Sequence, residues 1–294
     1  MINAMHYLNG QWVSDQELVI PVRDLSVVRG FGVFDYLRTY QNKPFHLDAH
    51  VDRFYNSAQM LGLEVPVTKD ELKNIVSEGL SKNSYPEKGI RMILTGGVSD
   101  DLISPSKPSL IVCFYQFTEP SKDQYAKGVK VITTPHVRHV PEAKSLSYLV
   151  AVLAQKQARE TGAIEALYVD PNTTQIFEAT TSNIFAVKDG VVITPKNDIL
   201  KGTTRQTVLD LCKDLSIEFS ESDVFLKDLP TFSEMFLTAA NKEVLPVISV
   251  DEQVIGDGKV GEIAKKLEHA YRNQIEKELE IKLASTKNPE TSLV

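Results

Sequence analysis

The chain has 294 residues, of which 42% are hydrophobic and 24% charged, and its formal net charge is −7 at pH 7. This length fits one or two domains of ordinary size, and the composition excludes a chain that stays disordered. No apolar run approaches the roughly 20 residues that span a bilayer, and the N-terminus lacks a basic stretch followed by an apolar one, so we expect a cytoplasmic protein with no membrane contact. Because no basic block recurs, nucleic acid is not an expected partner.

The cysteine pattern indicates neither a disulfide framework nor a metal site. Cys113 lies in an apolar, strand-like run, and Cys212 lies on a helix-like face. We expect both to be buried as small hydrophobic residues.

The first 120 residues carry signals for both strands and helices. Asn9-Gly10 separates two short apolar runs and is typical of a two-residue hairpin turn. A helix is expected over 48–61 behind an Asp cap, with Arg53 off its apolar face. A second helix begins at the capping box Thr68-Lys-Asp-Glu71. Two strands follow, over 90–94 and 110–117, with a long polar loop between them.

The polar segment Glu119-Pro-Ser-Lys-Asp is the best candidate for a linker, and it places a domain boundary near residues 118–128. Beyond it, a helix over 145–161 is expected to turn Leu149 and Leu153 inward. The remaining expected elements are strands over 129–134, 235–238 and 244–250, hairpins turning at Asp170-Pro-Asn and Asp189-Gly190, and helices over 204–215 and 260–275.

Lys144 and Glu178 are the first candidates for chemistry. Lys144 follows an extended, Pro-containing segment and precedes the expected helix, and a partly desolvated lysine at such a junction can act as nucleophile or base. The alternative is a solvated lysine ahead of a helix. Glu178 ends a strand before a run of small hydroxyl residues, where a carboxylate suits pairing with a buried ring nitrogen. The alternative is an exposed charge at a strand end.

Gly202-Thr203-Thr204-Arg205 opens a helix after an extended segment. Its backbone N–H groups, the threonine hydroxyls and the positive end of the helix make an anion site suited to phosphate, although an ordinary threonine cap is an equal alternative. Arg53 can bind the same phosphate bidentately, or it can form a salt bridge with Asp48 or Asp52.

In their order and spacing, these residues resemble one family over about residues 6–280. The stretches that carry the resemblance are Arg29-Gly-Phe-Gly-Val-Phe-Asp35, Pro44-Phe-His-Leu-Asp-Ala-His-Val-Asp-Arg53, Lys144-Ser-Leu-Ser-Tyr, Phe177-Glu-Ala-Thr-Thr-Ser-Asn-Ile-Phe185, Ile199-Leu-Lys-Gly-Thr-Thr-Arg205 and Glu243-Val-Leu-Pro-Val. They are similar to the class IV, pyridoxal-phosphate-dependent aminotransferases. That family includes branched-chain aminotransferases, D-amino-acid transaminases, R-selective amine transaminases and aminodeoxychorismate lyases.

The resemblance implies a two-domain fold that combines α/β and α+β architecture. A smaller N-terminal α/β domain would cover residues 1–120, a larger C-terminal cofactor-binding domain residues 121–283, and a flexible tail residues 284–294. It also implies that Lys144 carries pyridoxal 5'-phosphate as an internal Schiff base and that Glu178 pairs with its pyridine nitrogen. The implied phosphate contacts are Arg53, the amides of Thr203 and Thr204, and the backbone at Ala240, where a threonine is common in the family. No metal is expected.

The substrate pocket departs from the family pattern. The motifs are most similar to those of D-amino-acid transaminases. However, Phe34 stands where those enzymes have a tyrosine, and residues 92–106 lack their Arg-x-His motif. A desolvated carboxylate still needs a cationic partner, so we predict that Arg29 and Arg91 bind the substrate; the alternative is that both form ordinary ion pairs. The resemblance places the contacts of Arg29 on a partner subunit, which predicts a homodimer with its active site near the subunit interface.

The main prediction is a transaminase that moves an amino group between D-amino acids and 2-oxo acids such as 2-oxoglutarate. A branched-chain L-amino-acid aminotransferase is the first alternative. An aminodeoxychorismate lyase, which releases pyruvate, is the second. A catalytically silent binder of a phosphate ligand is disfavoured because Lys144 and Glu178 are both present.

Overall fold

The computed structural model describes residues 4–283, and the chain in it forms two compact units. Unit 1 comprises Met1–Thr118 and Glu142–Tyr148, and unit 2 comprises Glu119–Pro141 and Leu149–Val294. The tail expected over 284–294 lies outside the described residues.

The segment Glu142–Tyr148 differs from expectation because it belongs to unit 1 and not to the larger C-terminal part of the chain. The amide of Phe34 donates to the carbonyl of Lys144 over 2.9 Å, and the amide of Leu146 donates to the carbonyl of Gly32 over 2.9 Å. These bonds add the segment to the edge of a strand that is more than a hundred residues earlier in the chain. Local sequence patterns carry no signal for such a pairing.

Unit 1 is built on a six-stranded sheet with the order β2-β1-β6-β5-β3-β4. Its strands are β1 (Met5–Leu8), β2 (Gln11–Ser14), β3 (Gly32–Tyr40), β4 (Lys43–Pro44), β5 (Lys88–Thr95) and β6 (Leu110–Gln116). Its helices are α1 (Leu25–Arg29), α2 (Leu47–Met60) and α3 (Lys69–Lys82). The structure confirms the hairpin at Asn9-Gly10, which joins β1 to β2, and the capping box of Thr68 with Glu71.

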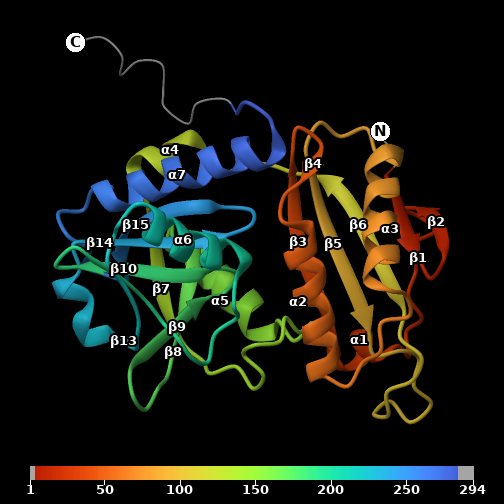
Figure 1. Ribbon diagram of the computed structural model, residues 1–294. Coiled ribbons are helices and arrows are strands. Elements are labelled where there is room, and N and C mark those ends of the chain that lie inside the picture. Colours follow the sequence, from red (N-terminus) through yellow and green to blue (C-terminus); the bar gives the residue numbers. More distant parts are fainter. Residues whose placement is uncertain (1–3, 284–294) are drawn as a thin grey trace. The chain divides into compact units, whose positions relative to one another are not determined.

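Helices α2 and α3 pack along one face of this sheet (Figure 1). Val51, Phe54 and Ala58 of α2 are buried against it, as their helical spacing predicts. The expected Asp cap is wrong, because α2 begins after His46, whose backbone is left-handed and whose side chain makes no capping bond. Asp48 lies in the first turn of the helix instead.

Unit 2 is built on a ten-stranded mixed sheet with the order β12-β11-β10-β14-β15-β7-β8-β9-β13, to which β16 adds by pairing with β15. Its strands are β7 (Val129–Pro135), β8 (Glu165–Val169), β9 (Gln175–Ala179), β10 (Asn183–Lys188), β11 (Val191–Thr194), β12 (Phe219–Glu221), β13 (Val224–Phe225), β14 (Glu234–Ala239), β15 (Glu243–Val250) and β16 (Gln253–Val254). Its helices are α4 (Lys122–Lys127), α5 (Leu149–Glu160), α6 (Thr203–Asp214) and α7 (Glu262–Leu279), with a short 3-10 helix η1 (Leu226–Thr231).

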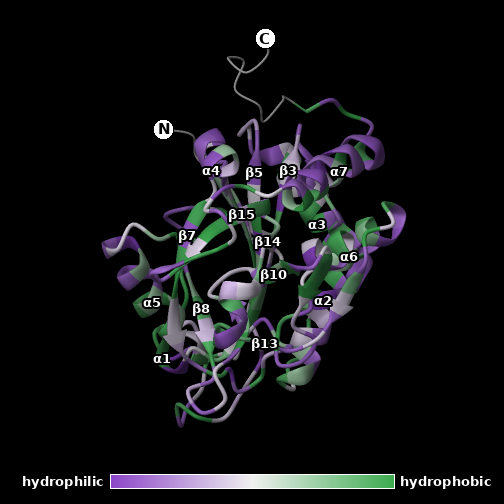
Figure 2. Cartoon of the chain, turned by 90° about the vertical axis from the view of Figure 1, so that its left-hand side faces the viewer, coloured by the Kyte–Doolittle hydropathy of each residue, from purple (hydrophilic) through white to green (hydrophobic). Residues whose placement is uncertain are grey.

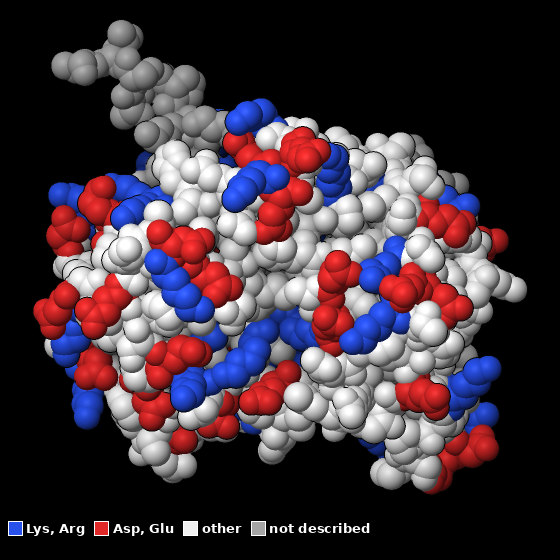
Figure 3. Space-filling model, viewed as in Figure 1, with Lys and Arg blue, Asp and Glu red and all other residues white. Residues whose placement is uncertain are grey.

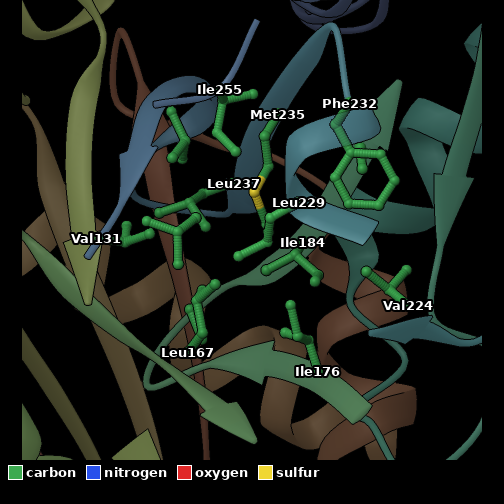
Figure 4. Packing of buried hydrophobic residues seen from close by; sticks show 14 of the residues in the cluster. Val131, Leu167, Ile176, Ile184, Val224, Leu229, Phe232, Met235, Leu237 and Ile255 are labelled. Atoms are coloured by element: carbon green, nitrogen blue, oxygen red, sulfur yellow. The ribbon is translucent and has the colours of Figure 1, made fainter. Parts of the chain in front are cut away.

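The strands of unit 2 surround a large apolar core. Figure 4 shows side chains from β7, β8, β9, β10 and β14 pointing toward one another. Val131, Leu167, Ile184 and Leu237 are at most 1% exposed there. Burial of aliphatic side chains at this density is worth roughly 1.5–3 kcal/mol for each one, which makes this core the fixed frame of the unit.

The helices of unit 2 present two different kinds of surface. Helix α7 buries a stripe that includes Leu267 and Tyr271, and the side of it seen in Figure 2 is mostly hydrophilic. Helix α5 buries the small residues Ala151, Ala154 and Ala158. The expectation that Leu149 and Leu153 point inward is wrong, because they are 71% and 59% exposed.

The described residues give no indication of a membrane span or of a metal site, and their surface charge is mixed. None of the helices there is long and apolar enough to cross a membrane, and no cluster of three or more His, Cys, Asp or Glu side chains is placed to hold a metal ion within residues 4–283. Figure 3 shows acidic and basic side chains interspersed over most of the visible face.

Candidate active-site residues

The backbone of Lys144 is held from two sides within unit 1. Its carbonyl accepts from the amide of Phe34 on β3, and its amide donates to the buried Ser57 hydroxyl of α2 over 3.1 Å. The Lys144 Nζ lies 4.7 Å from the centre of the Phe34 ring. The side chain is half-buried, so the amine rests on an aromatic face and is not simply solvated ahead of a helix.

Arg91 approaches the same aromatic ring. It lies on β5 directly opposite Tyr36 of β3, and its guanidinium carbon is 5.1 Å from the centre of the Phe34 ring. The structure therefore brings Lys144 and Arg91 to one side chain. Within the described part of the chain, Arg91 has no carboxylate partner, so the alternative of an ordinary ion pair does not hold for it there.

Arg29 is also without an acidic partner. It is the last residue of α1 and is exposed, and its Nη1 donates to the carbonyl of Val28 over 2.9 Å. No carboxylate within residues 4–283 pairs with it. Arg29 and Arg91 thus keep the charge that a substrate carboxylate would need.

Arg53 forms an ion pair, but with neither of the expected partners. Its Nε and Nη2 donate to the two carboxylate oxygens of Asp35 over 2.7 and 2.8 Å. Asp35 is fully buried, and His50 Nδ1 lies 2.7 Å from its Oδ1. The Arg53 side chain is 14% exposed, and its Nη1 has no partner among the described residues. Asp35 therefore occupies one edge of the guanidinium and leaves the third nitrogen for a ligand.

The charge states in this cluster follow from burial and from the neighbouring charges. Burial acts to raise the pKa of Asp35, but Arg53 and His50 outweigh it and hold that pKa well below its ordinary range. Burial lowers the pKa of His50, although the charge of Asp35 opposes this shift. Near neutral pH, Asp35 is therefore ionised and His50 is neutral, so the full ion pair of this cluster is the one between Asp35 and Arg53.

A bulge in β9 positions Glu178. Leu167 pairs with Ala179 and Val169 pairs with Ile176, so β9 holds one extra residue at this point. Ile176 and Ala179 consequently both face the core of unit 2. Strict alternation would have put Glu178 on the same face as Ile176, and the extra residue re-aims it.

The Glu178 carboxylate is buried, with a side chain 6% exposed, so the alternative of an exposed charge at a strand end is wrong. Arg138 Nη1 donates to its Oε1 over 2.7 Å. The amide of Leu200 donates to its Oε2 over 3.0 Å, and Asn183 Nδ2 lies 3.3 Å from the same oxygen. Glu178 is thus held in place by donors on both oxygens, and one of these donors is a guanidinium.

The N-terminus of α6 has the form of an anion site. The helix begins after Gly202, and no side chain caps it, so the alternative of a threonine cap does not apply. A Cβ at Gly202 would lie 2.1 Å from Asn183 Oδ1. Only glycine therefore allows the approach of Asn183, which also donates to the Leu200 carbonyl over 2.8 Å. Helix N-termini with uncapped amides attract phosphate groups.

A buried hydroxyl on the neighbouring strand also lacks a partner. Thr238 Oγ1 makes no hydrogen bond within the described residues. Thr238 lies directly opposite Asn183 in the β10–β14 ladder, so the two side chains share a face of the sheet. Ala240 follows in the turn after β14 and offers its backbone alone. A buried hydroxyl without a partner is costly, and here it suits a polar ligand.

Four further residues of these contacts have no recognisable signal of their own in the sequence: Asp35, His50, Arg138 and Asn183. Asp35 and His50 stand inside the stretches that carry the family resemblance, next to Phe34 and Arg53. Arg138 is 40 residues from Glu178, and the bulge that turns Glu178 away from the apolar core depends on the pairing of β9 with β8. A pattern limited to local periodicity cannot find such partners.

Comparison with known proteins places the chain in a family. Residues 32–250 match the family model described as Amino-transferase class IV. A Methanocaldococcus jannaschii protein with the provisional name of branched-chain-amino-acid aminotransferase is 38% identical over 277 residues, which are 91% of this chain and 95% of the relative. A D-alanine aminotransferase of Staphylococcus haemolyticus is 30% identical over 92% of this chain and 97% of its own length.

A solved structure agrees with these matches. The branched-chain aminotransferase from the archaeon Thermoproteus uzoniensis, solved with norvaline, superposes with a TM-score of 0.84 at 29% identity, over 93% of this chain and 95% of the other. A family model that spans most of the chain and relatives matched over nearly their whole length lead to one conclusion: the protein belongs to the class IV aminotransferases.

Proposed function

We propose that the protein is a homodimeric transaminase that moves an amino group between D-amino acids and 2-oxo acids such as 2-oxoglutarate. The observation that carries the substrate class is the pair of arginines, Arg29 and Arg91, that lack carboxylate partners within residues 4–283. Arg91 shares the Phe34 ring with Lys144. A carboxylate-bearing substrate held by such an arginine would lie close to the lysine amine.

Class IV aminotransferases depend on pyridoxal 5'-phosphate, and the residues of this chain suit that group. When bound, the cofactor supplies an electron sink for the bond broken at the substrate Cα. In our proposal Lys144 holds the cofactor covalently and Glu178 contacts its ring nitrogen. Arg53 Nη1 and the amides at Thr203, Thr204 and Ala240 hold its phosphate.

Three local features support this fit. The guanidinium of Arg53 is fixed by Asp35 and still has one nitrogen to offer. The N-terminus of α6 carries no side-chain cap. The buried hydroxyl of Thr238, which lies on the same sheet face as Asn183, has no partner in the described part of the chain. Each feature offers hydrogen-bonding capacity that an anion or a polar ring would satisfy.

The chain itself contributes proton transfer and charge. The Lys144 amine, once released, is the group that can carry a proton to and from the substrate Cα. Arg138 donates to Glu178 and favours its charged form, and a charged Glu178 can keep a proton on the ring nitrogen of the cofactor. Phosphate contacts at Arg53 and at the α6 N-terminus keep the ring in place while its covalent partner changes.

The D-amino-acid assignment is supported by relatives and tested by stereochemistry. The Staphylococcus relative is named a D-alanine aminotransferase. A branched-chain L-amino-acid aminotransferase is the second candidate, because the Methanocaldococcus jannaschii relative and the Thermoproteus uzoniensis structure are named branched-chain aminotransferases.

The deciding experiment mixes the cofactor-loaded protein separately with D-glutamate, L-glutamate and L-leucine, without an acceptor. Loss of the visible cofactor band and release of one equivalent of 2-oxo acid report the half-reaction. We expect D-glutamate to react fastest. Faster reaction of L-leucine than of any D-amino acid would replace the proposal by the branched-chain candidate. Borohydride reduction and peptide mapping should find the cofactor on Lys144, and any other lysine would contradict its assignment.

The exposed face of α5 supports the homodimer. Leu149, Val152 and Leu153 are 71%, 63% and 59% exposed, and they lie together on one side of a helix whose opposite side packs on β8. A second copy of this chain would cover them. Leu153→Asp should therefore lower the apparent mass in analytical ultracentrifugation, whereas Val254→Asp, at a 50% exposed valine on β16, should not. A monomeric parent protein would refute the homodimer.

A further inference from the structure

Arg138 occupies a position that the family assignment does not explain. Its Nη1 donates both to Glu178 Oε1 over 2.7 Å and to the carbonyl of Pro141 over 2.9 Å. The arginine side chain is 19% exposed and that of Glu178 is 6% exposed. One nitrogen therefore ties the buried carboxylate of β9 to the segment 136–141, which enters from β7.

The donors to Glu178 are not equivalent. Leu200 and Asn183 bring neutral N–H groups to Oε2, whereas Arg138 brings a full positive charge to Oε1. A buried carboxylate with neutral donors alone tends to take up a proton, because desolvation disfavours the charged form. The guanidinium charge at 2.7 Å therefore favours the ionised form of this carboxylate.

The same charge also reaches the rest of its segment. Partial burial lowers the pKa of His136, and the charges of Arg138 and His139 add to that shift. The His136 ring also contacts Tyr168 edge-on, with centroids 4.8 Å apart. Near neutral pH, His136 is therefore uncharged, and Arg138 is the residue of this segment that donates to Glu178.

We propose that Arg138 is a positioning residue of the transamination. By fixing Glu178 and holding it ionised, Arg138 sets how firmly the ring nitrogen of the cofactor keeps its proton. The inference rests on the proposed contact between Glu178 and that nitrogen. In this arrangement Glu178 contacts the cofactor, and Arg138 acts on the cofactor only through Glu178.

The test uses three variants of the cofactor-loaded protein. Arg138→Gln removes the charge, and Arg138→Lys keeps it on a different shape. Arg272→Gln is the matched control, because Arg272 is 15% exposed and pairs over 3.1 Å with Glu243, whose side chain is 2% exposed, in the same unit. Three readouts are needed: the pH midpoint of the visible cofactor band, kcat and KM measured separately, and thermal unfolding.

In Arg138→Gln we expect the band's pH midpoint to rise by about one unit. Without the guanidinium charge, Glu178 holds the ring-nitrogen proton less firmly, and a less electron-poor ring makes protonation easier at the nitrogen that links Lys144 to the cofactor. We expect kcat to fall more than tenfold while KM changes little. Arg138→Lys should restore much of both. Arg272→Gln should lose thermal stability to a similar extent and keep the parent midpoint and kcat.

Two results would overturn the inference in different ways. An Arg138→Gln variant that matches Arg272→Gln in all three readouts would make Arg138 a purely structural ion pair. If Glu178→Gln also leaves the pH midpoint unchanged, the proposed role of Glu178 fails as well. If Glu178→Gln shifts the midpoint and Arg138→Gln does not, the inference about Arg138 alone is wrong. Should Arg138→Gln not fold, the comparison of Arg138→Lys with the parent decides, because an unchanged midpoint with a lowered kcat would contradict control by charge.

Discussion

Each of the two units buries a carboxylate against an arginine, and the two pairs differ in which partner keeps hydrogen-bonding capacity for a ligand. In unit 1, Asp35 is fully buried and Arg53 is 14% exposed, with its Nη1 unused among the described residues. In unit 2, Glu178 is 6% exposed and accepts hydrogen bonds on both oxygens, while the Nη1 of Arg138 donates to Glu178 and to the carbonyl of Pro141. The shortest nitrogen–oxygen distance is 2.7 Å in both pairs.

The difference teaches how one type of contact can serve two purposes. A buried ion pair contributes little net stability, because desolvation of the charges offsets their attraction. It does fix the orientation and the charge of both partners. In unit 1 we assign the contact with the cofactor to the arginine, which suits a phosphate. In unit 2 we assign that contact to the carboxylate, which suits a ring nitrogen, and the arginine holds the carboxylate in place.

The largest expected effect comes from changing Glu178 to its amide, and the same change at Asp35 is the comparison. Glu178→Gln should lower kcat roughly 10²–10⁴-fold, the range for groups that govern proton transfer or developing charge, while the cofactor stays bound. Asp35→Asn should leave kcat at saturating cofactor nearly unchanged and weaken cofactor binding. Steady-state kinetics at several cofactor concentrations separate the two. Equal losses of kcat in both variants would show that the two pairs do not differ in role.

The sequence could predict the elements on which these pairs stand better than the pairs themselves. The hairpin at Asn9-Gly10 and the capping box at Thr68 follow from local backbone preference, and both are confirmed. The inward face of α5 was mispredicted, since Leu149 and Leu153 have the spacing of core residues whether the chain or another molecule covers them.

Asp35 and Arg138, which hold Arg53 and Glu178 in place, could not be predicted from the sequence for a different reason. Asp35 acts through a hydrogen bond to Arg53, 18 residues away, and Arg138 acts on a residue 40 positions later. The β9 bulge that redirects Glu178 depends on pairing with β8. Residue type and order can indicate that Lys144, Glu178 and Arg53 carry chemistry, whereas their supports depend on how the sheets pair.

The second prediction concerns the outward-facing arginine of unit 1. Arg53→Ala removes a charged hydrogen bond worth about 1.5–3 kcal/mol, so the cofactor should dissociate roughly ten- to a hundredfold more readily. The measurement is the loss of visible cofactor absorbance after dilution. Arg23→Ala is the control, because Arg23 pairs with Asp100 at the surface, where the two side chains are 56% and 97% exposed. Unchanged retention in Arg53→Ala would return Arg53 to a purely structural ion pair with Asp35.

The third prediction concerns the arginines that have no such support. Arg91→Ala should raise the KM for D-glutamate tenfold or more, as expected for the loss of a charged hydrogen bond of about 1.5–3 kcal/mol. Arg29→Ala should act likewise, with a larger effect on a dicarboxylic substrate than on D-alanine if the two arginines take different carboxylates. Primary amines, which have no carboxylate, serve as the internal control and should lose little. Near-normal D-glutamate kinetics in both variants would contradict a carboxylate site at these residues.

The smallest expected effect is on stability, and it distinguishes the supports of unit 1. His50 has a lowered pKa in the folded protein, so below its ordinary pKa of about 6.5 the unfolded chain takes up a proton that the folded protein refuses. Asp35 also has a lowered pKa, so its contribution is present above its ordinary value of about 3.9 and is lost on further acidification. Both shifts make acid lower the free energy of unfolding, His50 first and Asp35 at lower pH.

This order gives a sharp measurement. Between pH 7 and 5, the free energy of unfolding should fall with a slope to which His50 contributes at most about 1.4 kcal/mol per pH unit. His50→Gln should flatten that slope even if it lowers stability overall, because it removes the titrating group and keeps a hydrogen-bond donor. His269→Gln changes an exposed histidine of α7 and should leave the slope as it is. If His50→Gln and the parent lose stability in parallel over this range, proton uptake by His50 does not cause the loss. His50 would then be protonated in the folded protein and would pair with Asp35 alongside Arg53.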